Sequence, residues 1–117
     1  RGLRLTEEDA ATELKVILKA EARGSVEAIR AELEKLKHDE VRVRVLHTGI
    51  GGITASDVQL ALTSPEDTII LGFNVTSDND ARALAEERGI QIREYNIIYR
   101  LVEDIRAALE GKLKPRE

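Results

Sequence analysis

The sequence predicts an α/β fold: a three-layer α/β/α sandwich on a four-stranded parallel sheet. Segments patterned as strands alternate four times with segments of helical periodicity, which is typical of parallel strands joined by helical crossovers. Two of the four strands are almost continuously apolar and two alternate in polarity, as expected for central and edge strands respectively. At 117 residues the chain can bury one core without staples, and it contains no cysteine.

The first third of the chain contains a central strand, a helix and an edge strand. Residues 14–20 (LKVILKA) are aliphatic and predict a strand. Residues 26–36 carry apolar side chains at helical spacing, and Ser25 is the expected N-cap of that helix. Residues 41–46 (VRVRVL) alternate in polarity, which predicts a strand with one wet face.

The middle of the chain contains a glycine-rich turn, a short helix and the second central strand. Residues 49–52 (GIGG) predict a turn after the edge strand. Residues 54–57 (TASD) have the spacing of a capping box, which opens a short helix. The continuous apolar run 68–73 (TIILGF) indicates a strand buried on both faces.

The remaining elements are a helix, a second edge strand and a long final helix. Residues 77–80 are a second capping-box candidate, and Gly89 is expected to end the third helix in a left-handed conformation. Residues 90–95 alternate in polarity as an edge strand does. Apolar positions from 98 to 109 predict an amphipathic helix whose end is marked by Gly111 and Pro115.

Placing the apolar strands in the centre gives the strand order 2-1-3-4, and right-handed crossovers then put two helices on each face. In such sheets a ligand normally binds where the strand order reverses, beyond the carboxyl ends of the strands. Here that crevice is expected between residues 21–25 and 74–78, with the glycine turn nearby. We expect residues 1–12 to form a polar arm, 13–113 a single domain and 114–117 a charged tail.

Composition restricts the function classes. The formal net charge is −4, so the domain is not expected to bind free nucleic acid alone. No apolar run approaches the roughly 20 residues of a membrane span, so no membrane partner is expected. Abundant Glu, Lys and Arg without Met or Cys lean towards a thermophile's composition.

The sequence predicts no catalytic, cofactor-binding or metal site. The two histidines lack metal-ligand spacing, and Asn74 follows the third strand where a phosphoryl acceptor needs a carboxylate. The turn at 49–52 could cradle a phosphate, but it matches neither the dinucleotide fingerprint nor the P-loop, and a plain tight turn is the more frequent interpretation. The pair Gly24–Ser25 is equally ambiguous.

Several basic residues and the turn form a candidate interaction surface. His47 could act as a general base, contact a phosphate or be purely structural. Arg42 and Arg44 share one face of an edge strand, where they could dock onto an RNA backbone or an acidic partner, or only protect the edge from unwanted pairing. The candidate residues are Arg23, Gly24, Ser25, Arg42, Arg44, His47, Gly49, Gly51 and Gly52.

Three ordered segments, 14–20 with 24–28, 47–58 and 72–75, followed by 95–99 (YNIIY), together resemble one family. The chain from Glu13 to Leu113 resembles the third conserved domain of bacterial translation initiation factor two. The resemblance implies an α/β/α sandwich between the GTPase and barrel domains and the domain that holds initiator tRNA. It therefore implies an excised, cytoplasmic domain without a GTP site, tRNA site or cofactor of its own.

In that family the whole factor binds GTP, brings formylmethionyl-tRNA to the small ribosomal subunit and promotes subunit joining. The resemblance implies a non-catalytic spacer and relay whose partners are the neighbouring domains, and the ribosome and initiator tRNA through the parent protein. The alternatives are a small-ligand or nucleotide-binding domain that uses the crevice, and a ribosome-docking module that uses Arg23, Arg42 or Arg44. The sequence departs from the family pattern at 21–23, at Gly52 and at 76–77, so no RNA contact is transferred to those loops.

Overall fold

The structure, a computed structural model, describes residues 12–36 and 41–113. The predicted arm and tail lie outside the described residues, except that Thr12 begins the first strand. Strands and helices alternate as predicted. The elements are β1 (Thr12–Ala20), α2 (Arg23–Glu34), β2 (Val41–Ile50), α3 (Ala55–Ala61), β3 (Thr68–Phe73), α4 (Asn79–Arg88), β4 (Gln91–Tyr95) and α5 (Ile98–Leu113).

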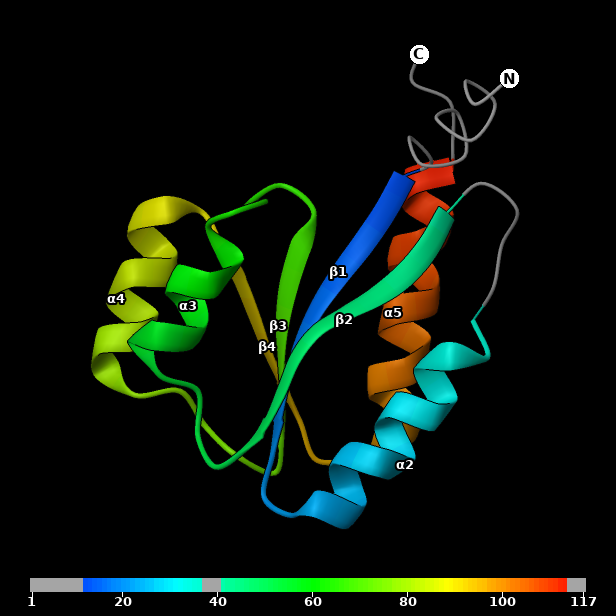
Figure 1. The fold of residues 1–117 in the computed structure, drawn as a ribbon, viewed down its shortest axis with the longest axis horizontal. Helices are drawn as coiled ribbons and strands as arrows, with labels where there is room; N and C mark the ends of the chain where they lie inside the picture. The colour runs from blue at the N-terminus through cyan, green and yellow to red at the C-terminus, as the bar shows by residue number, and fades with distance from the viewer. Residues whose placement is uncertain (1–11, 37–40, 114–117) are drawn as a thin grey trace, which may run out of the picture.

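The four strands form one parallel sheet in the order β2-β1-β3-β4, which confirms the predicted fold class and strand order (Figure 1). The two apolar strands, β1 and β3, lie in the centre because both of their faces are covered. Every residue of β3 is buried. β2 and β4 are the edges, as their alternating polarity predicted.

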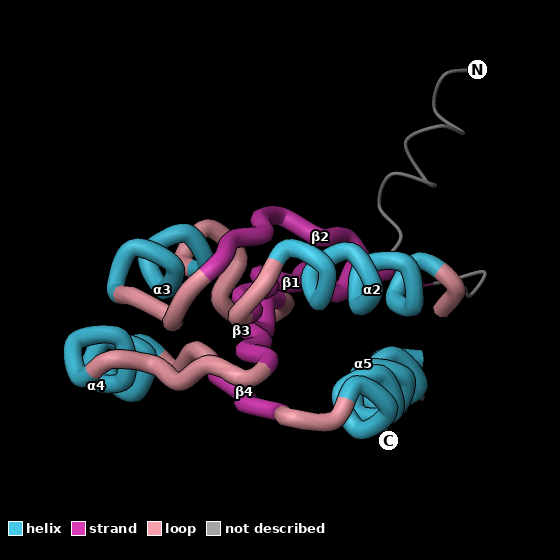
Figure 2. The backbone as a smooth tube through the Cα atoms, turned by 90° about the horizontal axis from the view of Figure 1, so that it is seen from below, coloured by secondary structure: helices cyan, strands magenta, loops and turns pink. Residues whose placement is uncertain are grey.

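Two helices pack over each face of the sheet, as the two hydrophobic clusters show, and Figure 2 shows the sheet between them. α2 and α5 lie on one face and share a hydrophobic cluster with Leu14, Val16 and Leu18 of β1. α3 and α4 lie on the other face over a smaller cluster that contains Ile17 and Ile70. Successive β1 side chains therefore serve opposite cores, which is the two-residue period of a strand.

Two predicted helix caps are wrong. Ser25 does not cap α2, because the helix begins directly after the extended residue Ala22, and the Ser25 hydroxyl instead donates to the Glu21 carboxylate at 3.1 Å. The predicted capping box at 77–80 does not form. The N-cap of α4 is Asp78, whose side chain accepts the Ala81 N–H at 2.7 Å.

Of the other predicted helix ends, two are confirmed and one differs. The box at 54–57 is confirmed, since the Asp57 carboxylate accepts the Thr54 N–H at 2.9 Å. Gly89 ends α4 at φ 73°, as predicted. α5 runs through Gly111 to Leu113, so Gly111 does not end the helix, and the second predicted marker, Pro115, lies outside the described residues.

Candidate functional site

Strand β2 is longer than its alternating pattern predicted, and this extension organises the basic residues. It continues past Leu46 through His47 and Gly49 to Ile50. Val45 lies opposite Val16, whereas His47 lies opposite Ile17, so Leu46 is the extra residue of a β-bulge. The expectation that the strand ends at Leu46 is therefore wrong, and His47 belongs to the ladder.

The bulge places His47 on the same face of β2 as Arg42 and Arg44. Parallel partners point to the same side of a sheet, and His47 is paired with Ile17, which faces α3 and α4. Val43 and Val45 pack on the opposite face, against the α2–α5 core, so the arginines between them also face the α3–α4 side. Without the extra residue His47 would point towards α2.

The α3–α4 side of the sheet is only partly covered. Its hydrophobic cluster reaches β1 at Ile17 and β2 at Leu46, and the residues before these on the same face are polar. Figure 1 shows α3 and α4 standing away from the first halves of β1 and β2. We name this polar surface the open β1–β2 face, and it comprises Glu13, Lys15, Arg42, Arg44 and His47.

The cations on the open β1–β2 face differ in their partners. The Arg44 guanidinium lies 3.7 Å from the Glu13 carboxylate, with 61% of its side chain exposed. Lys15 Nζ donates to the Ser64 hydroxyl at 2.7 Å. Within residues 12–36 and 41–113, the exposed side chains of Arg42 and His47 have neither a hydrogen bond nor an ion pair. Of the two arginines, Arg44 is therefore held weakly, and Arg42 has no partner in this part of the chain.

A buried ion pair closes the inner end of this face. Lys19 Nζ and Asp57 Oδ2 are 2.7 Å apart, with side-chain exposures of 10% and 6%. Gly49 lies against this pair, and a Cβ there would come within 3.0 Å of Lys19 Cε. The pair joins β1 to α3. The aliphatic part of the Lys19 side chain passes beside position 49, which leaves little room for a side chain larger than glycine. The sequence signal for such a pair was weak, because the mostly aliphatic segment 14–20 contains two lysines and only Lys19 forms a buried pair.

The predicted ligand crevice at the carboxyl ends of the strands is bridged by the chain itself. The Gly51 N–H donates to the Ala20 carbonyl at 2.8 Å, and the Ile53 N–H donates to the Thr76 carbonyl at 3.0 Å. Ile53 also forms an isolated parallel bridge with Ser77. These N–H groups are the donors that a phosphate cradle would need, so the turn favours a structural role.

The glycines of this turn are explained by its conformation. Gly51 has φ 111°, a region that side chains other than glycine rarely adopt. At Gly52 a Cβ would lie 2.9 Å from the Thr76 carbonyl oxygen. The turn therefore needs glycine in order to cross the strand ends closely.

The candidate residues do not form one surface. Arg23, Gly24 and Ser25 lie in the first turn of α2, directly after the end of β1 and close to Gly51. Arg42 lies opposite Glu13, near the start of β1. The set divides into a group at the carboxyl ends of the strands (Arg23, Gly24, Ser25, Gly51, Gly52) and a group within β2 (Arg42, Arg44, His47, Gly49).

A contact that the sequence did not reveal joins β4 to α5. The Tyr95 hydroxyl donates to Asp104 Oδ2 at 2.6 Å. Burial raises the pKa of Tyr95 above its ordinary value of 10.0, the hydrogen bond to Asp104 raises it further, and Arg93 opposes the shift. The two residues are nine positions apart in different elements, so no local pattern could have identified them.

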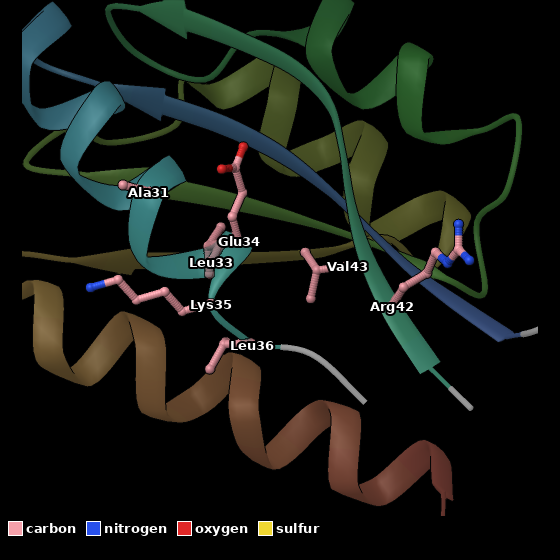
Figure 3. Close-up of a pocket in the computed structure, with 7 residues that line it drawn as sticks. All are labelled: Ala31, Leu33, Glu34, Lys35, Leu36, Arg42 and Val43. Carbon is pink, nitrogen blue, oxygen red and sulfur yellow. The ribbon is translucent and has the colours of Figure 1, made fainter. Parts of the chain in front are cut away.

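An open groove of about 990 Å³ lies between the end of α2 and the start of β2 (Figure 3). Leu33, Leu36 and Val43 form its apolar part, whereas the charged side chains of Lys35 and Arg42 point away from these residues. Ligand sites usually combine an apolar lining with a few polar groups that point into the pocket. This groove has the apolar lining, but its charged side chains do not converge on it.

Two kinds of site are not found among the described residues. No group of three or more His, Cys, Asp or Glu side chains in residues 12–36 and 41–113 is placed to hold a metal ion. In the same ranges no helix combines the length and apolarity that crossing a membrane requires.

Comparisons with known proteins agree with one another. The sequence model of the family described as Translation-initiation factor 2 matches residues 3–106. A protein of Rhodopirellula baltica named translation initiation factor IF-2 is 53% identical over 114 residues, which are 97% of this chain and 11% of that protein. The protein of the same name from Thermosipho africanus is 46% identical over 115 residues, or 98% of this chain and 16% of that protein.

A solved structure supports the fold. The crystal structure of GDP-bound aIF5B from Aeropyrum pernix matches with a TM-score of 0.65 and 24% identity, over 95% of this chain and 19% of that one. At this identity the likeness concerns the fold alone. The chain spans a small part, between a tenth and a fifth, of the proteins it matches.

Proposed function

This chain belongs to the translation initiation factor 2 family, and on that premise we propose that it is a non-catalytic domain that serves as a rigid spacer and relay in a larger initiation GTPase. In this proposal the whole factor works in the cytoplasm, binds GTP, brings formylmethionyl-tRNA to the small ribosomal subunit and promotes subunit joining. The domain lies between the GTPase and barrel domains and the tRNA-binding domain, and it passes the nucleotide state from one to the other.

The observation that carries the proposal is that β1 and α5 share one hydrophobic core. Leu14, Val16 and Leu18 of β1 belong to the same cluster as Leu101 and Ile105 of α5. These five side chains are at most 2% exposed. Close-packed interiors deform little, so a rotation imposed on β1 would be transmitted to α5 instead of being absorbed.

The positions of the two ends of the domain also support a relay by rigid-body rotation. Figure 1 shows β1 beginning and α5 ending at the same end of the sandwich. Because β1 and α5 share one core, a rotation of β1 would turn the end of α5 with it as part of one rigid body. Coupling of this kind still requires an element with two arrangements elsewhere in the factor.

The test inserts two kinds of linker directly after Leu113 in a full-length factor that carries this domain. One insert is about seven flexible Gly and Ser residues, and the matched control is about seven helix-forming residues, which add roughly two helical turns. Subunit joining is measured by light scattering with GTP and with GDP. We expect the flexible insert to reduce the advantage of GTP over GDP much more than the helical insert does.

Two outcomes would reject the relay. In the first, both variants join subunits with the same GTP dependence as the unmodified factor. In the second, both lose the GTP dependence equally, which would mean that spacing matters and stiffness does not. GTP hydrolysis by each variant without ribosomes confirms that the GTPase domain is intact.

A further inference from the structure

We propose that the open β1–β2 face binds the phosphodiester backbone of RNA through Arg42 and Arg44, with His47 continuing the same row. This surface goes beyond the relay and does not depend on it, because a domain can contact RNA whether or not it transmits a rotation. The proposal assigns a role to basic residues that the core does not use.

The geometry of β2 arranges these side chains in a line. Alternate residues of a strand are about 6.6 Å apart, so Arg42 and Arg44 stand at a regular spacing on one face. The bulge at Leu46 adds His47 to the same row. Two guanidinium groups at this spacing suit the regularly spaced charges along a nucleic-acid strand, and contacts to phosphates carry no base specificity.

Both guanidinium groups are available. Arg42 is exposed, and its side chain has no partner within residues 12–36 and 41–113. Arg44 faces Glu13 across 3.7 Å in an exposed pair, and such pairs contribute little and exchange readily. Guanidinium can bind phosphate through two parallel hydrogen bonds, so a phosphate would compete well for both.

The charge balance of the face predicts weak, salt-sensitive binding. The face carries one carboxylate, that of Glu13, and three cations, Lys15, Arg42 and Arg44, so two positive charges remain in surplus. With two such contacts in a chain of net charge −4, we expect weak binding of free RNA that is measurable only at low salt, which revises the expectation from composition that the domain binds no free nucleic acid alone. The face is therefore suited to an auxiliary contact within an assembly that is held together by other domains.

The same face is poorly suited to an acidic protein partner. Protein interfaces are usually anchored by buried aromatic or aliphatic side chains. The exposed large apolar residues of the described chain are Ile50, Leu60, Ile97 and Tyr99, and none of them belongs to the open β1–β2 face. A surface with cations and no apolar anchor fits a phosphate backbone better.

The experiment measures binding of the full 117-residue chain to a fluorescein-labelled RNA hairpin of roughly 20 nucleotides by fluorescence anisotropy. Two phosphate contacts predict that Kd rises roughly tenfold between about 50 and about 200 mM salt. The double variant Arg42→Gln and Arg44→Gln should lose most of the affinity and nearly all of this salt dependence.

The control variant is Arg30→Gln with Arg106→Gln. Both arginines are exposed and each lies beside a carboxylate, as Arg44 does, but they lie on α2 and α5. This variant changes net charge by the same amount and should keep its Kd within about twofold, because it removes no phosphate contact. Circular dichroism melts of both variants confirm that they are folded.

Three results would overturn the proposal. The first is no detectable binding of the unmodified chain at the lower salt concentration. The second is an equal loss of affinity in the two double variants, which would reflect net charge alone. The third is binding of a poly-glutamate peptide as tightly as RNA, with the same dependence on Arg42 and Arg44, which would assign the face to an acidic protein.

Discussion

Replacing Lys19 with methionine should destabilise the domain substantially, although methionine fills nearly the same space. Lys19 and Asp57 form an ion pair at 2.7 Å in which both side chains are at least nine-tenths buried. Removing one partner of a buried pair typically costs about 3–5 kcal/mol, because the other charge stays buried and uncompensated. Asp57 keeps hydrogen bonds from the Thr54 N–H at 2.9 Å and hydroxyl at 3.3 Å, so we expect the lower end, about 3 kcal/mol.

Replacing Asp57 with alanine should cost more than replacing Lys19. The Lys19 ammonium has no other partner in the described part of the chain, so it would be left buried alone. The substitution also removes the carboxylate that caps α3, which is worth about 1 kcal/mol. We expect a loss of about 4–6 kcal/mol for Asp57→Ala.

The double variant Lys19→Met with Asp57→Ala tests whether the two residues stabilise the domain as an ion pair or independently of each other. With both charges removed, only the lost cap and a small packing defect remain. We expect it to be at least about 2 kcal/mol more stable than the sum of the single losses predicts. A surface control is Lys35→Met, which breaks an exposed pair with Glu32 at 3.3 Å and should change stability by less than about 1 kcal/mol.

Urea unfolding followed by far-ultraviolet circular dichroism suits this chain, which has no tryptophan. A loss of about 3 kcal/mol moves the midpoint by about 1–3 M urea for a domain of this size. The reasoning is refuted if Lys19→Met unfolds at the same urea concentration as the unmodified domain. Strict additivity of Lys19→Met and Asp57→Ala would also refute it.

Three further predictions test single features. Burial and the hydrogen bond to Asp104 raise the pKa of Tyr95, so the protonated hydroxyl stabilises the folded state fully at neutral pH, and this contribution is lost as the pH rises above 10. Asp104→Asn should lower the pKa of Tyr95, which an NMR titration of ¹³C-labelled tyrosine measures. Gly51→Ala should cost about 1–3 kcal/mol in urea unfolding because of its φ of 111°, whereas Gly24→Ala, in open space within a helix, should add roughly 0.5–1 kcal/mol. Asp78→Ala should lower stability by about 1 kcal/mol and Asp78→Asn much less, since asparagine can still cap α4; equal losses would contradict the cap.

The architecture could be predicted because it depends on local pattern. An uninterrupted apolar strand such as 68–73 must be covered on both faces, and Val26, Ile29 and Leu33 at helical spacing must face a core. These requirements place β1 and β3 in the centre. The handedness of crossovers then distributes the helices over the two faces.

The candidate surface could be predicted only residue by residue. The basic residues and glycines were identifiable from their types and positions, but the sequence does not say which of them lie together. The bulge at Leu46 changes which face His47 occupies, and nothing in the local polarity pattern marks where a strand gains an extra residue. The Ile53–Ser77 bridge similarly decides that the expected crevice is crossed by the chain.

The sequence by itself determined the parallel sheet, the order of its strands and the family, because each of these depends on residue types within short segments. Only the tertiary structure decided the pairing of Lys19 with Asp57, 38 residues apart, the placement of Arg42, Arg44 and His47 on one open face, and the shared core of β1 and α5. Those features depend on register and on contacts between distant segments, which exist only after the chain has folded.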